Sequence, residues 1–168
     1  YAAKINGPGR VRIKAVKSEV YFAAFPSLDT AGALMTLYDL FPQFTPAQNI
    51  LQTSLDDIGM VLHPITTLLN SSRIEQMGPY RNAFYDITPS VSRVMERVDE
   101  ERVGIARAFG CEALSLLETY EMIYGVRGKT PYEAIRSVDA YKIQMAPDSL
   151  THRYVSEEIP YSLVPTAA

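Results

Sequence analysis

The longest regular pattern in the sequence begins at Thr88-Pro89 and continues to Gly110. Threonine is favoured at a helix N-cap, and proline is favoured in the first helical position because no N–H has to be satisfied there. Apolar residues then recur at helical spacing, at Val91, Val94, Val98, Ile105 and Phe109. Gly110 suits the left-handed residue that follows a last turn. We therefore expect a long amphipathic helix with other helices packed against its apolar side.

Several further segments have helical patterns with start signals. We expect helices over residues 30–40, 54–70, 111–124 and 130–138. Their N-caps would be Asp29 or Thr30 for the first, Ser54 for the second, and Thr130 for the last. The 54–70 segment has the strongest apolar stripe, formed by Leu55, Ile58, Leu62, Ile65 and Leu69. Residues 48–52 are apolar and short enough for a strand, and the proline-containing tail from 145 to 165 shows no clear period.

The N-terminal part predicts a small β element. Residues 10–25 contain two alternating apolar runs, on either side of the polar Lys17-Ser18-Glu19. Alternation on both sides of a short polar segment predicts a hairpin between the two runs. The expected fold is therefore mainly α, a helical bundle with a short N-terminal β-hairpin.

Composition limits the classes of function. The chain has 168 residues, which suits one domain, and a net charge of -3, which argues against a nucleic-acid binder. It has one cysteine, Cys111, so we expect a reducing, cytoplasmic environment and a buried structural thiol. No apolar run approaches the roughly 20 residues that cross a membrane. The first residue is Tyr1 rather than methionine, which indicates a fragment or a processed product.

His63 lies inside the strongest helical pattern and directly precedes Pro64. Proline cannot donate to the carbonyl of Met60 and tends to kink a helix. Small and polar residues share the His63 face, with Gly59 at offset −4, Thr67 at +4 and Asn70 at +7. Such a stripe could line a ligand pocket. The alternative is a partly buried histidine with a structural hydrogen bond.

A second cluster runs from His152 to Tyr161. Arg153 lies between aromatic residues, where a guanidinium can bind a carboxylate through two parallel hydrogen bonds. Glu157 and Glu158 could accept the ring N–H of a histidine. The alternative is a surface segment with ordinary ion pairs.

Other common site signals are missing. Gly7-Pro8-Gly9 lacks the third glycine of a dinucleotide fingerprint and precedes a strand rather than following one. There is no P-loop, and two histidines and one cysteine, far apart, make no convincing zinc site.

Together these motifs resemble one family. The residues that carry the resemblance are Ser54-Leu55-Asp56-Asp57, Leu62-His63-Pro64, the segments 88–91 and 98–102, and the tail segments 146–150, 152–154 and 157–165. In order and spacing they are similar to the helical domain of the octopine/nopaline (opine) dehydrogenases. That resemblance implies the helical architecture shared with 6-phosphogluconate dehydrogenase relatives. It also implies that residues 1–26 are the end of a Rossmann domain and that residues 27–168 form the substrate-binding domain.

The resemblance also implies a reaction. Family members join an amino acid and a 2-oxo acid as an imine and reduce it with NAD or NADP cofactors, which the missing Rossmann domain would bind. His63 would be the acid/base. Its carboxylate partner, usually aspartate in the family, would be Glu158, with Glu157 as the fallback. Arg153 would hold a substrate carboxylate, and Thr67 and Asn70 would line the substrate site.

Two competing interpretations remain. A non-catalytic helical module for dimerisation or partner binding would have no reason to bring His63, Arg153 and Glu158 together, and a homodimer fits either hypothesis. A related hydroxyacid dehydrogenase would carry a lysine where this chain has His63, and no lysine lies between Lys17 and Lys129. The segment 84–88 departs from the family pattern, so the choice of amino acid does not follow from the resemblance.

Overall fold

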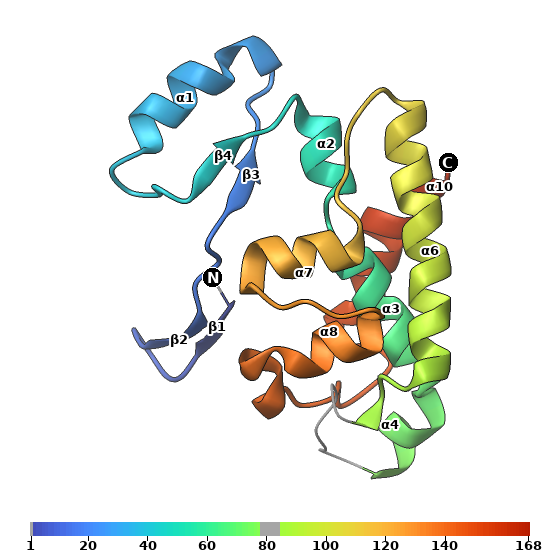
Figure 1. The fold of residues 1–168 in the computed structure, drawn as a ribbon. Helices are drawn as coiled ribbons and strands as arrows, with labels where there is room; N and C mark the ends of the chain where they lie inside the picture. The colour runs from blue at the N-terminus through green and yellow to red at the C-terminus, as the bar shows by residue number, and fades with distance from the viewer. Residues whose placement is uncertain (1, 78–84) are drawn as a thin grey trace.

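The computed structural model describes residues 2–77 and 85–168, with the backbone alone for residues 2–4, 14, 15 and 77. The mainly helical fold is confirmed (Figure 1). Its longer helices are α1 (Thr30–Leu37), α2 (Ile50–Leu55), α3 (Gly59–Leu69), α4 (Ser71–Met77), α6 (Pro89–Ala108), α7 (Leu116–Tyr124) and α8 (Pro131–Ser137). Within these residues no helix is both long and apolar enough to cross a membrane.

The strands pair differently from the sequence-based prediction. Strand β2 (Val11–Ala15) pairs antiparallel with β1 (Ala2–Ile5), and β3 (Val20–Phe22) pairs in parallel with β4 (Phe44–Pro46). The predicted hairpin between β2 and β3 is therefore wrong. Gly7 and Gly9, with φ of 123° and 66°, make the turn between β1 and β2 instead.

Lys17-Ser18-Glu19 is not a hairpin turn because its polar atoms bind elsewhere. The Ser18 hydroxyl donates to the carbonyl of Met122 at 2.8 Å, which fixes this segment against the end of α7. Glu19 accepts from the Thr45 hydroxyl at 2.8 Å, which joins it to β4. These partners are distant in sequence, and alternation alone could not indicate them.

The segment β3–α1–β4 is a β-α-β unit, two adjacent parallel strands joined by a helix. Helix α1 ends at Leu37 rather than Leu40. Asp29 takes the N-cap position without a side-chain cap bond, while the Thr30 hydroxyl accepts from the amide of Ala24 at 3.1 Å. Large apolar side chains around this unit are exposed, including Phe25 at 84%, Leu28 at 94% and Met35 at 83%.

The expected helix 54–70 is two helices with a turn between them. Asn49, not Ser54, is the first cap: its Oδ1 accepts from the amide of Gln52 at 3.0 Å, and Gln52 Oε1 accepts from the amide of Gln48 at 2.7 Å. Residues 48–52 therefore form the cap and the first turn of α2, which begins at Ile50, and the strand predicted there is wrong. Ser54 lies inside α2 and donates to the carbonyl of Ile50. Helix α3 then begins at Gly59 and continues through Pro64.

Helix α6 follows the prediction at both ends. Thr88 Oγ1 accepts from the amide of Val91 at 3.3 Å, and Gly110 has a φ of 71°. Its buried side is partly different, because Val94 and Phe109 are 42% and 66% exposed while Met95 is fully buried. Helices α3, α6, α7 and α8 share the main core, whose buried residues are Met60, Val61, Leu62, Ile65, Ile87, Val91, Met95, Leu116, Tyr120, Ala134, Ile135 and Val138.

The last two predicted helices are also present. Helix α7 starts at Leu116 rather than Cys111, because Ser115 and Glu118 form a capping box there. Thr130 caps α8 by accepting from the amide of Glu133. Cys111 is 3% exposed, as expected for a structural thiol.

The tail is regular over short stretches, which the sequence did not indicate. It forms α9 (Arg153–Ser156), the π-helical turn η3 (Ile159–Leu163) and α10 (Val164–Ala167), after the 3-10 turn η2 (Asp139–Ile143). Both α9 and η3 pack against α3. The tail therefore lies beside the helix that carries His63.

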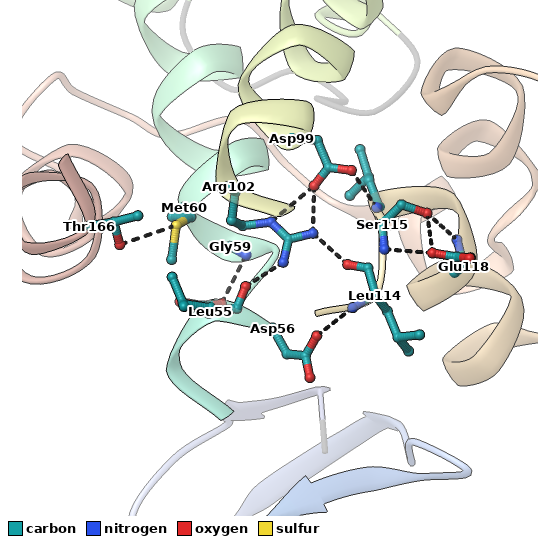
Figure 2. Close-up of polar contacts among 12 residues, drawn as sticks. Leu55, Asp56, Gly59, Met60, Asp99, Arg102, Leu114, Ser115, Glu118 and Thr166 are labelled. Carbon is teal, nitrogen blue, oxygen red and sulfur yellow. Dashed lines mark hydrogen bonds and ion pairs between the residues drawn. The ribbon is translucent and has the colours of Figure 1, made fainter. Parts of the chain in front are cut away.

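Arg102 is 2% exposed and joins three segments of the chain (Figure 2). Its Nε and Nη2 donate to Asp99 Oδ1, at 3.0 and 2.6 Å. Its Nη1 donates to the carbonyl of Leu55 at the end of α2, and its Nη2 also donates to the carbonyl of Leu114 at 2.6 Å. Asp99 Oδ2 accepts from the amide of Leu116 at 2.6 Å. The ion pair is thus buried with its hydrogen-bonding groups satisfied.

We expect Arg102→Met to lower the free energy of unfolding by about 3–5 kcal/mol, because Asp99 would remain as a buried charge without its partner. Urea denaturation followed by circular dichroism measures this. The matched control is Arg97→Met on the same helix: Arg97 pairs with Glu100 in solvent, with side chains 72% and 65% exposed, and its loss should cost less than about 1 kcal/mol. Equal losses in the two variants would contradict a stabilising role for the buried pair.

Candidate active site

His63 and Glu158 are hydrogen-bonded although 95 residues separate them. His63 lies in the middle of α3, and Glu158 lies in the tail, immediately before η3. The His63 Nδ1 to Glu158 Oε1 distance is 2.8 Å. The packing of the tail along α3 therefore brings together an imidazole and a carboxylate that belong to separate clusters in the sequence.

Gly59 provides the space that Glu158 occupies. It lies one turn before His63 on α3, and a Cβ built there would stand 3.3 and 3.4 Å from the two carboxylate oxygens of Glu158. The same Cβ would be 2.8 Å from Asp57 Oδ1, which accepts from the amide of Gly59 at 2.9 Å. The hydroxyl of Ser162 donates to Glu158 Oε2 at 3.5 Å. A glutamate thus fits beside the histidine because residue 59 has no side chain.

The environment favours the neutral form of His63. Burial is the largest effect and lowers the pKa of the imidazole, and the positive charge of Arg153 lowers it further. The hydrogen bond to Glu158, its charge and that of Asp57 act in the opposite direction without reversing the shift. A carboxylate only accepts, so Nδ1 carries the proton and Nε2 of the neutral ring has a free lone pair. That arrangement is suited to a general base.

Tyr154 also contacts His63, although the sequence pattern indicated no role for it. The two ring centroids are 3.8 Å apart and the ring planes differ by 2°, so the rings are stacked. Tyr154 follows Arg153 in the sequence, but only the packing of α9 on α3 shows that its ring stacks on His63.

Arg153 and Glu157 form a pair of their own. The distance from Arg153 Nε to Glu157 Oε2 is 3.3 Å, and the two side chains are 62% and 57% exposed. Glu158, not the fallback Glu157, is therefore the partner of His63 in this structure. Arg153 is close enough for its charge to affect the pKa of His63, yet it faces solvent.

Thr67 and Asn70 share the His63 face but are engaged in bonds within the fold. Thr67 is fully buried, and its hydroxyl donates to the carbonyl of His63 at 2.7 Å. The Asn70 amide nitrogen donates to the carbonyls of Thr66 and Asp86, at 2.9 and 3.1 Å. In this structure both side chains fasten the C-terminal half of α3.

Comparisons with known proteins identify the family. Residues 46–168 match the family model described as NAD/NADP octopine/nopaline dehydrogenase, alpha-helical domain. The chain belongs to this family. An opine dehydrogenase from Arthrobacter sp. (strain 1C) is 36% identical over 165 residues, which are 98% of this chain and 46% of that enzyme.

Other relatives share shorter stretches. Protein ocs of Agrobacterium tumefaciens (strain Ach5) is 26% identical, over 70% of this chain and 33% of its own length. A D-nopaline dehydrogenase of Agrobacterium vitis is 36% identical, over 41% of this chain and 17% of its own length. The chain thus spans about half the length, or less, of the octopine/nopaline dehydrogenase relatives that it matches.

We expect Gly59→Ala to lower the free energy of unfolding by about 1–2 kcal/mol, because the new methyl group displaces the Asp57 carboxylate that caps the first turn of α3. Gly104→Ala is the matched control: Gly104 lies inside α6, and a methyl group added there would have nothing within 4 Å, so alanine should stabilise by up to about 1 kcal/mol. Urea unfolding compares the two variants. A stabilising Gly59→Ala would show that the space beside Glu158 is not restricted.

The lowered pKa of His63 predicts a pH dependence of stability. The folded state holds this proton less tightly than the unfolded state. The stability that neutral His63 contributes is therefore present above the ordinary pKa of 6.5 and is lost as the pH falls below it. We expect the free energy of unfolding to fall less in His63→Gln than in the parent chain as the pH is lowered from about 7 to 5. Urea unfolding at a series of pH values measures this. Tyr161→Ala, which changes an exposed side chain of the tail, should keep the full decrease of the parent chain. An unchanged slope in His63→Gln would contradict the predicted direction of the shift.

Proposed function

We propose that this chain carries the proton-transfer and substrate-binding side of an NAD(P)-dependent opine dehydrogenase. The observation that supports it is the hydrogen bond between His63 and Glu158, two residues whose roles the family resemblance implied. A purely structural interaction module would have no need to bring a histidine and a carboxylate together from such remote segments. The substrates would be an amino acid and a 2-oxo acid, joined as an imine.

Gly7-Pro8-Gly9 does not have the geometry of a dinucleotide-binding motif. Gly7 and Gly9 lie in the turn between two antiparallel strands, and no helix N-terminus follows them to bind a pyrophosphate. A nicotinamide cofactor would supply the hydride, and we propose that it is held mainly by the part of a nucleotide-binding domain that lies outside these residues. The residues of this chain would transfer the proton and bind the substrate carboxylates.

His63 would transfer the proton. In the oxidative direction its free Nε2 lone pair can accept a proton from the secondary amine or from water. Glu158 would hold Nδ1–H and stabilise the imidazolium that results. In the reverse direction the imidazolium would return that proton. The lowered pKa keeps the base form available near neutral pH.

Arg153 would bind a substrate carboxylate. Its guanidinium is exposed and lies next in sequence to Tyr154, whose ring is stacked on His63. Its ion pair with Glu157 is also exposed, and such pairs contribute little free energy, so exchanging Glu157 for a substrate carboxylate costs little. Since Thr67 and Asn70 are bonded within the fold, we propose that they act on substrate indirectly, by holding α3 in place.

The N-terminal segment would belong to the cofactor-binding part. The family match for the helical domain begins at residue 46, where β4 ends, and β3–α1–β4 is the repeating unit of a parallel α/β sheet. Two parallel strands are not stable alone, and parallel sheets are covered on both faces. We therefore propose that residues 1–45, not only 1–26, complete a nucleotide-binding domain whose remainder packs on the exposed apolar side chains near Phe25 and Met35.

The test is a chimera in which this chain replaces the matching segment of the Arthrobacter opine dehydrogenase. We expect NAD(P)H oxidation that requires both an amino acid and a 2-oxo acid, measured as the loss of NAD(P)H absorbance. His63→Gln should lower kcat by about 10²–10⁴-fold, because proton transfer is lost. Arg97→Met, at the exposed ion pair on α6, is the control and should keep kcat.

Two results would count against the proposal. A folded chimera without activity towards any amino-acid and 2-oxo-acid pair would contradict the function. An active chimera in which His63→Gln retains full kcat would contradict the assignment of His63 as the acid/base.

A further inference from the structure

Tyr154 covers one face of the His63 imidazole. The ring centroids are 3.8 Å apart and the planes are within 2° of parallel. The hydrogen bond from Nδ1 to Glu158 fixes the position of one atom of the imidazole. It still allows the plane of the ring to tilt about that nitrogen. A flat ring stacked on the imidazole opposes that tilt. The two contacts together define the direction of Nε2.

Tyr154 is itself held from two sides. The Gln144 side-chain amide donates to its hydroxyl at 3.0 Å. His152 lies edge-on to the Tyr154 ring, with centroids 4.5 Å apart, and His152 Nδ1 accepts from the amide of Tyr154 at 3.3 Å. Tyr154 is therefore held in a defined position.

We propose that Tyr154 is a positioning residue for His63: its ring keeps water from one face of the imidazole and orients Nε2 towards the substrate. The proton-transfer part of this role rests on the proposed function, whereas the effect on the imidazole does not. The hydroxyl of Tyr154 serves only to hold the ring, through Gln144. A phenylalanine at this position should therefore keep the positioning role, whereas a non-planar side chain should lose it.

The groups that face His63 define the expected effect of removing the ring. Glu158 from the tail and Asp57 from the turn before α3 favour the imidazolium, while Arg153 on α9 and burial oppose it. Loss of the Tyr154 ring admits water to one imidazole face, so burial, the largest effect on the pKa of His63, weakens. The pKa of His63 should then rise towards its ordinary value of 6.5.

The experiment is an NMR titration of the imidazole nitrogens and carbon-bound protons in the 168-residue chain. Because the chain has two histidines, the signals that are lost in His63→Gln are those of His63. In the parent chain and in Tyr154→Phe we expect the neutral ring to carry its proton on Nδ1, with ring-current-shifted imidazole protons. Tyr154→Leu should raise the pKa of His63 and remove the ring-current shift. Tyr161→Ala, which removes an exposed tyrosine of the same tail, should change none of these.

Unchanged His63 signals in a folded Tyr154→Leu variant would overturn the proposal. So would a Tyr154→Phe or Gln144→Ala variant with a raised pKa of His63, because the hydroxyl network rather than the stacked ring would then be responsible. These two variants keep the test decisive even if Tyr154→Leu does not fold. The readouts need no turnover, so an inactive chimera with the expected titration would contradict the proposed function and leave the positioning role of Tyr154 supported.

Discussion

The guanidinium of Arg102 determines where the helix carrying the site begins. It binds the carbonyl of Leu55, the last residue of α2, and the carbonyl of Leu114, before α7 (Figure 2). A buried charge is tolerated only where a partner and hydrogen bonds replace its water, and Asp99 with these two carbonyls does so. Because the end of α2 is fixed, the turn to Gly59 is fixed as well. The direction of His63, one turn further along α3, follows from that constraint.

The pairing of His63 with a glutamate depends on the smallest residue in the helix. An aspartate beside His63 would need less room, whereas Glu158 brings its carboxylate into the space above Gly59. The Asp57 carboxylate lies against the same glycine, so two acidic side chains approach one point of the backbone. Their negative charge partly offsets the burial of the imidazole, and the balance favours a neutral ring. The protonation state of the histidine is thus linked to the absence of a side chain at residue 59.

Local signals predicted the fold best. Thr88, Gly110 and Thr130 act within one turn of their own helices, so their roles at helix ends could be inferred from neighbouring residues. Strand pairing could not, because Ser18 and Glu19 bind residues of α7 and β4 that are remote in sequence. The break between α2 and α3 was missed for a similar reason. Ser54 and Asn49 are both good caps, and the buried contact with Arg102 favours the helix that starts at Asn49 and ends at Leu55.

The roles of the site residues were inferred from the family resemblance. The pairing of His63 with Glu158 rather than with Glu157 has a local cause. Residues four apart share one face of a helical turn. Arg153 and Glu157 are such a pair and bind each other in solvent. Tyr154 and Glu158 are the next such pair, rotated towards α3, and both contact His63. The order Arg-Tyr followed by Glu-Glu thus separates an exposed charged face from a face that holds the imidazole. What the sequence could not supply is the contact that orients this turn, because the packing of the tail on α3 joins residues as far as 95 positions apart.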